Sequence, residues 1–199
     1  MMKKIIKDTL SLVVITIVAG VCLAFVHELT LDTIAAAEAE ERAASYREVF
    51  PEATDFVAVS EFGIVDYNVA PLSGVSIGEA LFAVDGNGEP IGCVVSATSA
   101  NGYAGDVVLS VGIDLDGVIT GMKVTSMSET SGLGSHCTDA SFQAQFKGIS
   151  GEVTATKTGK TKPNEIDAIS GATFTTNAVT EAVNGALKTW EELFGGEAA

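Results

Sequence analysis

The stretch ALFAVDGNGEPIGCVVSATS, residues 80–99, decides the fold. It contains two runs rich in β-branched residues, and between them Asp85-Gly86-Asn87-Gly88 supplies residues that tolerate positive φ, which indicates a hairpin. Similar runs follow at 107–114 (VVLSVGID) and 118–127 (VITGMKVTSM), joined through Asp116-Gly117, and one precedes at 56–60 (FVAVS). Short runs of this kind separated by turn residues are typical of strands. We therefore expect an antiparallel sheet between residues 55 and 127.

Helices are expected on either side of these strands in the sequence. Residues 29–50 are rich in Ala and Glu and end at Pro51, which predicts a helical linker. A short helix is expected over 139–146. After Thr175, an apolar face at helical spacing predicts a C-terminal helix; its residues are Val179, Val183, Leu187 and Trp190. Residues 150–164 are expected to form an exposed loop. The predicted class is α+β, with one domain and flanking helices.

The N-terminal segment TLSLVVITIVAGVCLAFV, residues 9–26, has no charged residue. At ~1.5 Å per residue it nearly spans the ~30 Å of bilayer hydrocarbon, which predicts one transmembrane helix. Lys3, Lys4 and Lys7 precede it and acidic residues follow it. By the positive-inside rule the N-terminus is cytoplasmic and the bulk of the chain is extracytoplasmic.

Three other interpretations of this segment are less well supported. A signal peptide cleaved near residues 35–37 has the difficulty that the apolar run exceeds the usual ~7–15 residues. A lipoprotein modified at Cys22 would require a small residue where Val21 stands. A buried core helix would not explain the charge asymmetry of the flanks.

The composition limits the function classes. The net charge is −15, and three of the 11 basic residues precede the apolar run, so the remaining chain is strongly acidic. Such a surface repels phosphate backbones, and we therefore expect no nucleic-acid partner. Cys93 and Cys137 could pair, but the cysteines show neither CxxC nor CxxCH spacing, so no metal or haem site is predicted.

The segment DAISGAT, residues 167–173, directly precedes the predicted C-terminal helix. Its small side chains would let the backbone approach a ligand, and free N–H groups at a helix start attract an anion. Ser and Thr in this position are also common helix N-caps, and the heptapeptide alone favours that simpler interpretation.

The motif D-x-x-S-G-A-T resembles the flavinylation motif of the FMN-binding domain family, in which the last threonine forms a phosphoester with FMN. A second patch of the family is present as Gly102-Tyr103-Ala104-Gly105-Asp106, followed by Glu129-Thr130-Ser131-Gly132-Leu133-Gly134. Ser131 departs from the commoner proline, which should loosen the turn without removing its glycines. The resemblance is closest to the G subunits of Rnf electron-transport complexes and covers nearly the whole chain. The C subunits of sodium-translocating NADH:quinone reductases are similar.

The resemblance implies the site. Thr173 would carry covalent FMN and Asp167 would belong to the motif read by a flavin transferase that uses FAD as donor. The other implied cofactor-binding residues are Ser170, Gly171, Ala172, Glu129, Thr130, Gly132, Leu133, Gly134 and Tyr103. No residue is predicted to be a catalytic acid, base or nucleophile. His27 and His136 are interpreted as interface or surface residues, and Phe142, Phe146 and Trp190 as core, whereas Phe174 could serve either role.

The implied function is that of a redox subunit in a membrane-bound Rnf-type ferredoxin:NAD oxidoreductase complex, with other subunits as partners and ion translocation coupled to electron relay. The expected organisation is a cytoplasmic N-terminus (1–8), a transmembrane helix (9–28), a helical linker (29–54) and an extracytoplasmic FMN-binding domain (55–199) in the cytoplasmic membrane. Two alternatives stay open: the quinone reductase subunit, and a non-redox membrane-tethered binding domain whose glycine-rich segments only make turns.

Overall fold

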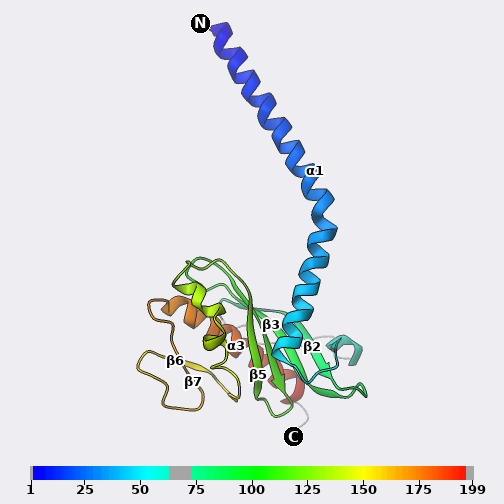
Figure 1. Ribbon diagram of the computed structural model, residues 1–199, viewed down its shortest axis with the longest axis vertical. Coiled ribbons are helices and arrows are strands. Elements are labelled where there is room, and N and C mark those ends of the chain that lie inside the picture. Colours follow the sequence, from blue (N-terminus) through cyan, green and yellow to red (C-terminus); the bar gives the residue numbers. More distant parts are fainter. Residues whose placement is uncertain (1, 63–72, 196–199) are drawn as a thin grey trace. The chain divides into compact units, whose positions relative to one another are not determined.

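The computed structural model describes residues 2–62 and 73–195 (Figure 1). The chain divides into two compact units, Met1–Arg42 and Ala43–Ala199. The described part of the first unit belongs to the helix α1, which runs without a break from Met2 to Val49. Within it, Leu12–Leu31 is apolar and long enough to cross a membrane, with a mean hydropathy of 2.4 and no residue of the window buried. The expected apolar helix and helical linker are therefore one continuous helix.

The second unit contains a five-stranded antiparallel sheet in the order β1-β2-β3-β4-β5, so each strand pairs with its neighbour in sequence. The strands are β1 (Asp55–Ala58), β2 (Val75–Val84), β3 (Pro90–Ser99), β4 (Val107–Asp114) and β5 (Ile119–Met127). Both expected hairpins are present: Asp85–Glu89 turn between β2 and β3, and residues 115–118 turn between β4 and β5. The predicted α+β class and antiparallel sheet are confirmed.

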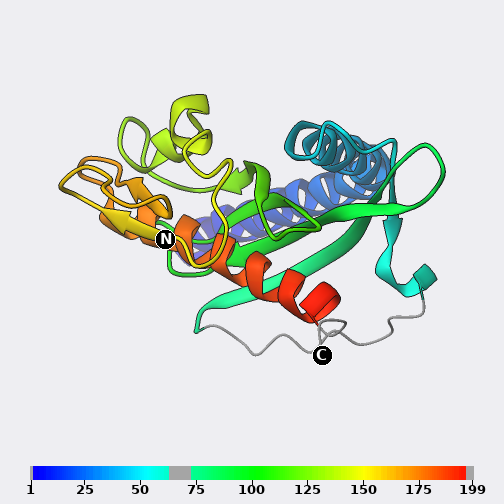
Figure 2. The same ribbon diagram turned by 90° about the horizontal axis from the view of Figure 1, so that it is seen from below.

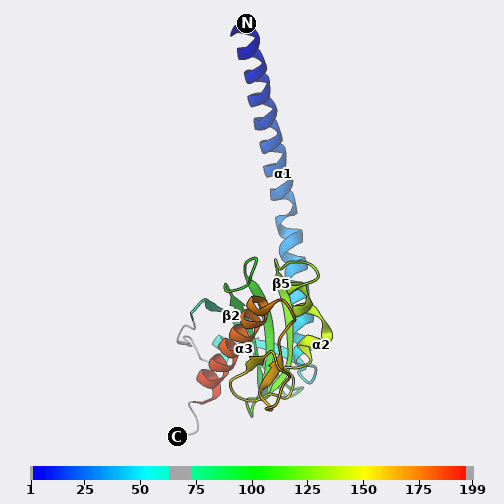
Figure 3. The same cartoon turned by 90° about the vertical axis from the view of Figure 1, so that its left-hand side faces the viewer.

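The helix α3 (Thr173–Phe194) covers one face of the sheet (Figure 2 and Figure 3). Alternate residues of β2 to β5 point toward it, and with the apolar face of α3 they form the main core. Val95, Leu109 and Val111 from the strands and Val179 and Val183 from the helix are among its most buried members. The helical apolar face predicted from the sequence is the face that α3 buries.

The last two turns of α1 belong to this unit and lie on the opposite face (Figure 2). There Tyr46, Val49 and Phe50 pack with residues of β2 and β3 in a second apolar cluster. Two paired glycines, Gly112 and Gly121, let the helix end approach the sheet, because a Cβ on either would lie 2.5 or 2.9 Å from backbone atoms of Val49. These residues hold the end of α1 against the strands.

Between β5 and α3 the chain forms short elements. These are the 3-10 helix η2 (Gly134–Thr138), the helix α2 (Ala140–Gln143) and the strands β6 (Thr154–Thr156) and β7 (Glu165–Asp167); a further 3-10 helix, η1 (Val59–Phe62), follows β1. The helix expected over 139–146 is thus a single turn. The expectation of a loop over 150–164 was wrong in part, since β6 pairs in parallel with β7.

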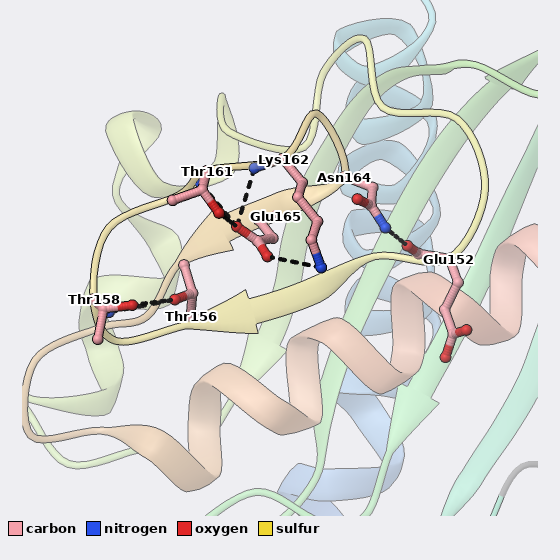
Figure 4. Close-up of polar contacts among 7 residues, drawn as sticks. All are labelled: Glu152, Thr156, Thr158, Thr161, Lys162, Asn164 and Glu165. Atoms are coloured by element: carbon pink, nitrogen blue, oxygen red, sulfur yellow. Dashed lines mark hydrogen bonds and ion pairs between the residues drawn. The ribbon is translucent and has the colours of Figure 1, made fainter.

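Side chains close this β6–β7 excursion (Figure 4). The Glu165 carboxylate accepts hydrogen bonds from the backbone N–H of Thr161 at 2.7 Å and of Lys162 at 3.1 Å, and from the Thr161 hydroxyl at 2.9 Å. These donors hold the pKa of Glu165 below its ordinary value. Asn164 donates to the carbonyl of Glu152 at 2.7 Å. The excursion is therefore ordered by polar contacts and leads directly into residues 167–173.

Candidate functional site

The predicted acceptor, Thr173, is the first residue of α3. The residue at the N-cap position is Ala172, and no side chain makes a cap hydrogen bond there. The interpretation of Thr173 as a helix cap was therefore wrong. Within the described part of the chain the Thr173 hydroxyl has no hydrogen-bond partner, and the side chain is half-buried. A free hydroxyl at the start of a 22-residue helix is open to modification and faces the positive end of the helix dipole.

Thr173 lies at a cavity of about 390 Å³ where three segments meet. They are the loop after β3, the segment after β5, and the start of α3. The cavity is lined by Tyr103, Glu129, Thr130, Leu133, Gly134, Gly171, Ala172, Thr173, Phe174 and Thr175. Most of the residues that the resemblance implied as cofactor-binding are thus brought together, although they come from segments about 30 to 45 residues apart in the sequence.

The rim of this cavity is apolar and exposed. Tyr103 is 71% exposed and Phe174 is 66% exposed, and their ring centroids are 6.4 Å apart. Leu133 is 47% exposed. Large apolar side chains left in solvent around a cavity favour an occupant with an apolar, planar surface. Phe174, whose role the sequence left undecided, lines the cavity rather than the core.

Glu129 is buried between the walls of the cavity. One carboxylate oxygen accepts hydrogen bonds from the backbone N–H groups of Tyr103 at 2.8 Å and Ala104 at 3.3 Å. The other accepts one from the hydroxyl of Thr175 at 2.8 Å. Thr175 is 1% exposed and was not among the residues expected to form the site. Only its position two residues after Thr173 marked it in the sequence, and that does not reveal its partner.

Three of the implied site residues, Gly132, Asp167 and Ser170, line a neighbouring shallow hollow instead. It also contains His136, whose Nδ1 lies 2.8 Å from a carboxylate oxygen of Asp139. Asp167 accepts a hydrogen bond from the backbone N–H of Lys160 at 2.8 Å and is exposed. The motif residues before Thr173 therefore belong to a surface beside the cavity.

A third hollow, of about 490 Å³, lies along the C-terminal half of α3 and is lined by Trp190, Leu187 and Glu181 among others. It contains none of the implied site residues. Phe142 and Phe146 are buried in the core and Trp190 packs against it, in agreement with the expectation for them.

Cys93 and Cys137 are both buried with free thiols. Burial raises the pKa of Cys93 well above its ordinary value. Burial, together with the negative charge of Glu129, raises the pKa of Cys137 to about 11. The pairing that the sequence left open is absent, and neither thiol is activated as a nucleophile.

Comparison with known proteins assigns the family. Residues 102–188 match the FMN-binding domain, and residues 1–49 match the RnfG N-terminal region. The RnfG protein of the Na(+)-translocating ferredoxin:NAD(+) oxidoreductase complex of Acetobacterium woodii is 36% identical over 197 residues, which are 96% of this chain and 94% of that protein. The chain belongs to the RnfG family. A second RnfG protein, from the ion-translocating oxidoreductase complex of Methanosarcina acetivorans, is 33% identical and covers 93% of this chain and 94% of its own length.

The fold is also found outside the RnfG proteins. The crystal structure of Shewanella oneidensis NqrC superposes with a TM-score of 0.53 over 76% of this chain and 87% of that one, at 18% identity. At that identity the likeness concerns the fold alone. The match of residues 1–49 to the RnfG N-terminal region includes the apolar part of α1, and this assigns that segment as the membrane span of the chain.

Proposed function

We propose that this RnfG protein is the electron-transfer subunit of a membrane-bound Rnf-type ferredoxin:NAD oxidoreductase complex, and that it carries FMN covalently bound to Thr173. The single observation behind the proposal is the free Thr173 hydroxyl on the first turn of α3, beside an apolar-rimmed cavity. In this assignment the chain relays electrons between carriers of the complex, and the relay is coupled to ion translocation by the partner subunits.

The residues at the cavity fit FMN. The uncapped start of α3 offers backbone N–H groups and a positive dipole end to a phosphate. The exposed rings of Tyr103 and Phe174 and the side chain of Leu133 offer apolar surface to the isoalloxazine. When bound, FMN would exchange one or two electrons, and the protein would set its distance, potential and solvent access.

Attachment would be a phosphoryl transfer from FAD catalysed by a flavin transferase. The Thr173 oxygen would attack the flavin-bearing phosphorus, a new O–P bond would form, and the pyrophosphate bond of FAD would break with release of AMP. The hydroxyl proton would leave to solvent or to the transferase. No oxidation or reduction is involved in this step. A covalent ester would retain FMN in a compartment that does not supply it freely.

We further propose that the domain is extracytoplasmic, since Lys3, Lys4 and Lys7 precede the span. In this topology the cytoplasmic N-terminus comprises residues 1–8, the transmembrane helix 9–28, the helical linker 29–54 and the FMN-binding domain 55–199. The compact unit of the structure begins earlier, at Ala43, because the end of α1 packs on the sheet.

Two alternatives are weighed against this function. The relatives that cover nearly the whole chain are RnfG proteins of ion-translocating oxidoreductase complexes, which favours the Rnf-type complex over the quinone reductase. The match of residues 102–188 to the FMN-binding domain favours a flavoprotein over a non-redox binding domain. The neighbouring genes would distinguish the two complexes.

The proposal is tested by an intact mass and a visible spectrum of the full-length chain, produced with and without a flavin transferase. We expect one esterified FMN per chain, and a flavin absorption band that survives denaturation, only when the transferase is present. A chain that stays colourless with an active transferase and FAD would overturn the assignment. A flavin that is lost on denaturation would overturn the covalent linkage alone.

A further inference from the structure

Glu129 has a place in the site that the resemblance does not convey. The resemblance implied that it binds the cofactor, but both of its carboxylate oxygens are occupied by protein donors. Oε1 accepts from the N–H groups of Tyr103 and Ala104, and Oε2 accepts from the Thr175 hydroxyl. With 9% exposure, the side chain is directed to these partners and not to solvent.

These hydrogen bonds connect two walls of the cavity. Tyr103 and Ala104 belong to the loop after β3, whereas Thr175 belongs to the first turn of α3. The loop also carries the exposed Tyr103 ring, and the helix turn carries Phe174, so the carboxylate holds the two rings at their separation of 6.4 Å. Thr173, two residues before Thr175, is on the same turn.

Two glycines make room for the carboxylate. A Cβ on Gly102 would lie 2.7 Å from Oε1, and a Cβ on Gly134 would lie 2.5 Å from Oε2 and 2.6 Å from the Thr175 hydroxyl oxygen. No side chain is compatible with such distances. Glycine at these two positions is therefore explained by the close packing of the walls around Glu129 and not only by approach of a ligand.

We propose that Glu129 is a positioning residue that ties the loop after β3 to the start of α3 and sets, through its buried negative charge, the reduction potential of the flavin attached beside it. This inference rests on the proposed flavin site. Three charge-assisted hydrogen bonds fix the carboxylate. Because flavin reduction increases electron density on the ring, a fixed negative charge at the cavity wall disfavours reduction and lowers the potential.

Glu129→Gln and Glu129→Ala separate the two roles. The amide of Gln keeps the shape, since its oxygen accepts from the backbone N–H groups and its NH₂ donates to the Thr175 oxygen, but the charge is lost. Ala removes both the charge and the link. Glu181→Gln is the matched control, because Glu181 is a carboxylate on α3 that accepts from the Asn101 side chain at 2.7 Å and lines the hollow near Trp190.

The link is measured first in the flavin-free full-length chain in detergent, by hydrogen exchange of the Tyr103 and Ala104 amides. We expect exchange at least about tenfold faster in Glu129→Ala, because a hydrogen bond to a charged acceptor is lost, and near wild-type exchange in Glu129→Gln and Glu181→Gln. Unchanged protection in Glu129→Ala, with the fold retained, would overturn the positioning role.

The charge is measured second, by spectroelectrochemical titration of the flavin-loaded chains. We expect the two-electron potential of Glu129→Gln to rise by at least about 30 mV, which corresponds to a tenfold change in the equilibrium constant, while Glu181→Gln stays at the wild-type value. An equal potential in wild type and Glu129→Gln would overturn the electrostatic role. If the wild-type chain accepts no flavin, the proposed function fails, and the exchange measurement still decides whether Glu129 holds the walls together.

Discussion

Thr173 and Thr175 are two residues apart, and the structure predicts opposite consequences for their replacement by valine. The change is nearly isosteric and removes only a hydroxyl at each position. The Thr173 hydroxyl has no partner among the described residues and the side chain is half-buried, so Thr173→Val should change the free energy of unfolding by no more than about 0.5 kcal/mol. The variant should nevertheless carry no covalent flavin.

At Thr175 the hydroxyl is buried and donates to the Glu129 carboxylate at 2.8 Å. Loss of a hydrogen bond to a charged group destabilises by about 1.5–3 kcal/mol. For a chain of this size, where ~1 kcal/mol shifts Tm by about 2–4 °C, the Tm of Thr175→Val should fall by about 3–12 °C. Covalent flavin should be retained, because the acceptor oxygen is untouched.

The assay is in-gel flavin fluorescence under denaturing conditions, with a melting curve for each full-length variant produced with the transferase. Thr173→Ser serves as a positive control, because it keeps an oxygen nucleophile and should be modified in part. Fluorescence of Thr173→Val after denaturation would show that the acceptor is another residue. Loss of flavin from a folded Thr175→Val would show that attachment depends on the Glu129 contact and not on the Thr173 hydroxyl alone.

Three further predictions concern other parts of the chain. Asp167→Ala should reduce flavin attachment in the fluorescence assay while leaving the melting curve nearly unchanged, because its carboxylate is exposed beside the acceptor; a wild-type rate of attachment would contradict a role in recognition. Phe50→Ala should lower the free energy of unfolding by about 3–5 kcal/mol in denaturant melts, since Phe50 is 2% exposed in the cluster beneath α1; a loss below ~1 kcal/mol would contradict tight packing there. Because the folded pKa of Cys137 is raised to about 11 from an ordinary 9.0, its contribution to stability is present below pH 9.0 and lost as pH rises through about 11; Cys137→Ser should flatten that part of the melting profile, and an equally steep decline in the variant would contradict this cause.

Local sequence features predicted the sheet and α3 because their signals are local. The β-branched runs and the residues between Asp85 and Glu89 determine strands and a turn within a few positions, and the spacing from Val179 to Trp190 determines the buried face of one helix. The extent of α1 into the sheet could not be predicted, because it depends on Gly112 and Gly121 making room for the helix end.

The candidate site shows the same limit. The family motif marked Thr173 and its neighbours, but it did not separate the residues that line the cavity from Asp167 and Ser170, which lie on the adjoining surface. The contact between Thr175 and Glu129 spans 46 positions and is created only when α3 docks on the sheet. The β6–β7 pair was missed for a similar reason, since a parallel pair of three-residue strands has almost no periodic signal.

The bare start of α3 has a consequence for the biogenesis of the protein. Ala172 gives the helix no side-chain cap, so the newly made chain leaves N–H groups of the first turn without an intramolecular acceptor. A phosphoester on Thr173 would place an anion at this helix end, which typically stabilises by about 0.3–1 kcal/mol. Modification would then act as the last step of folding, and the unmodified chain would fray at the same turn that the assembling complex must receive. Surveillance proteases that act on frayed segments would thereby remove subunits that lack a cofactor before they enter the complex.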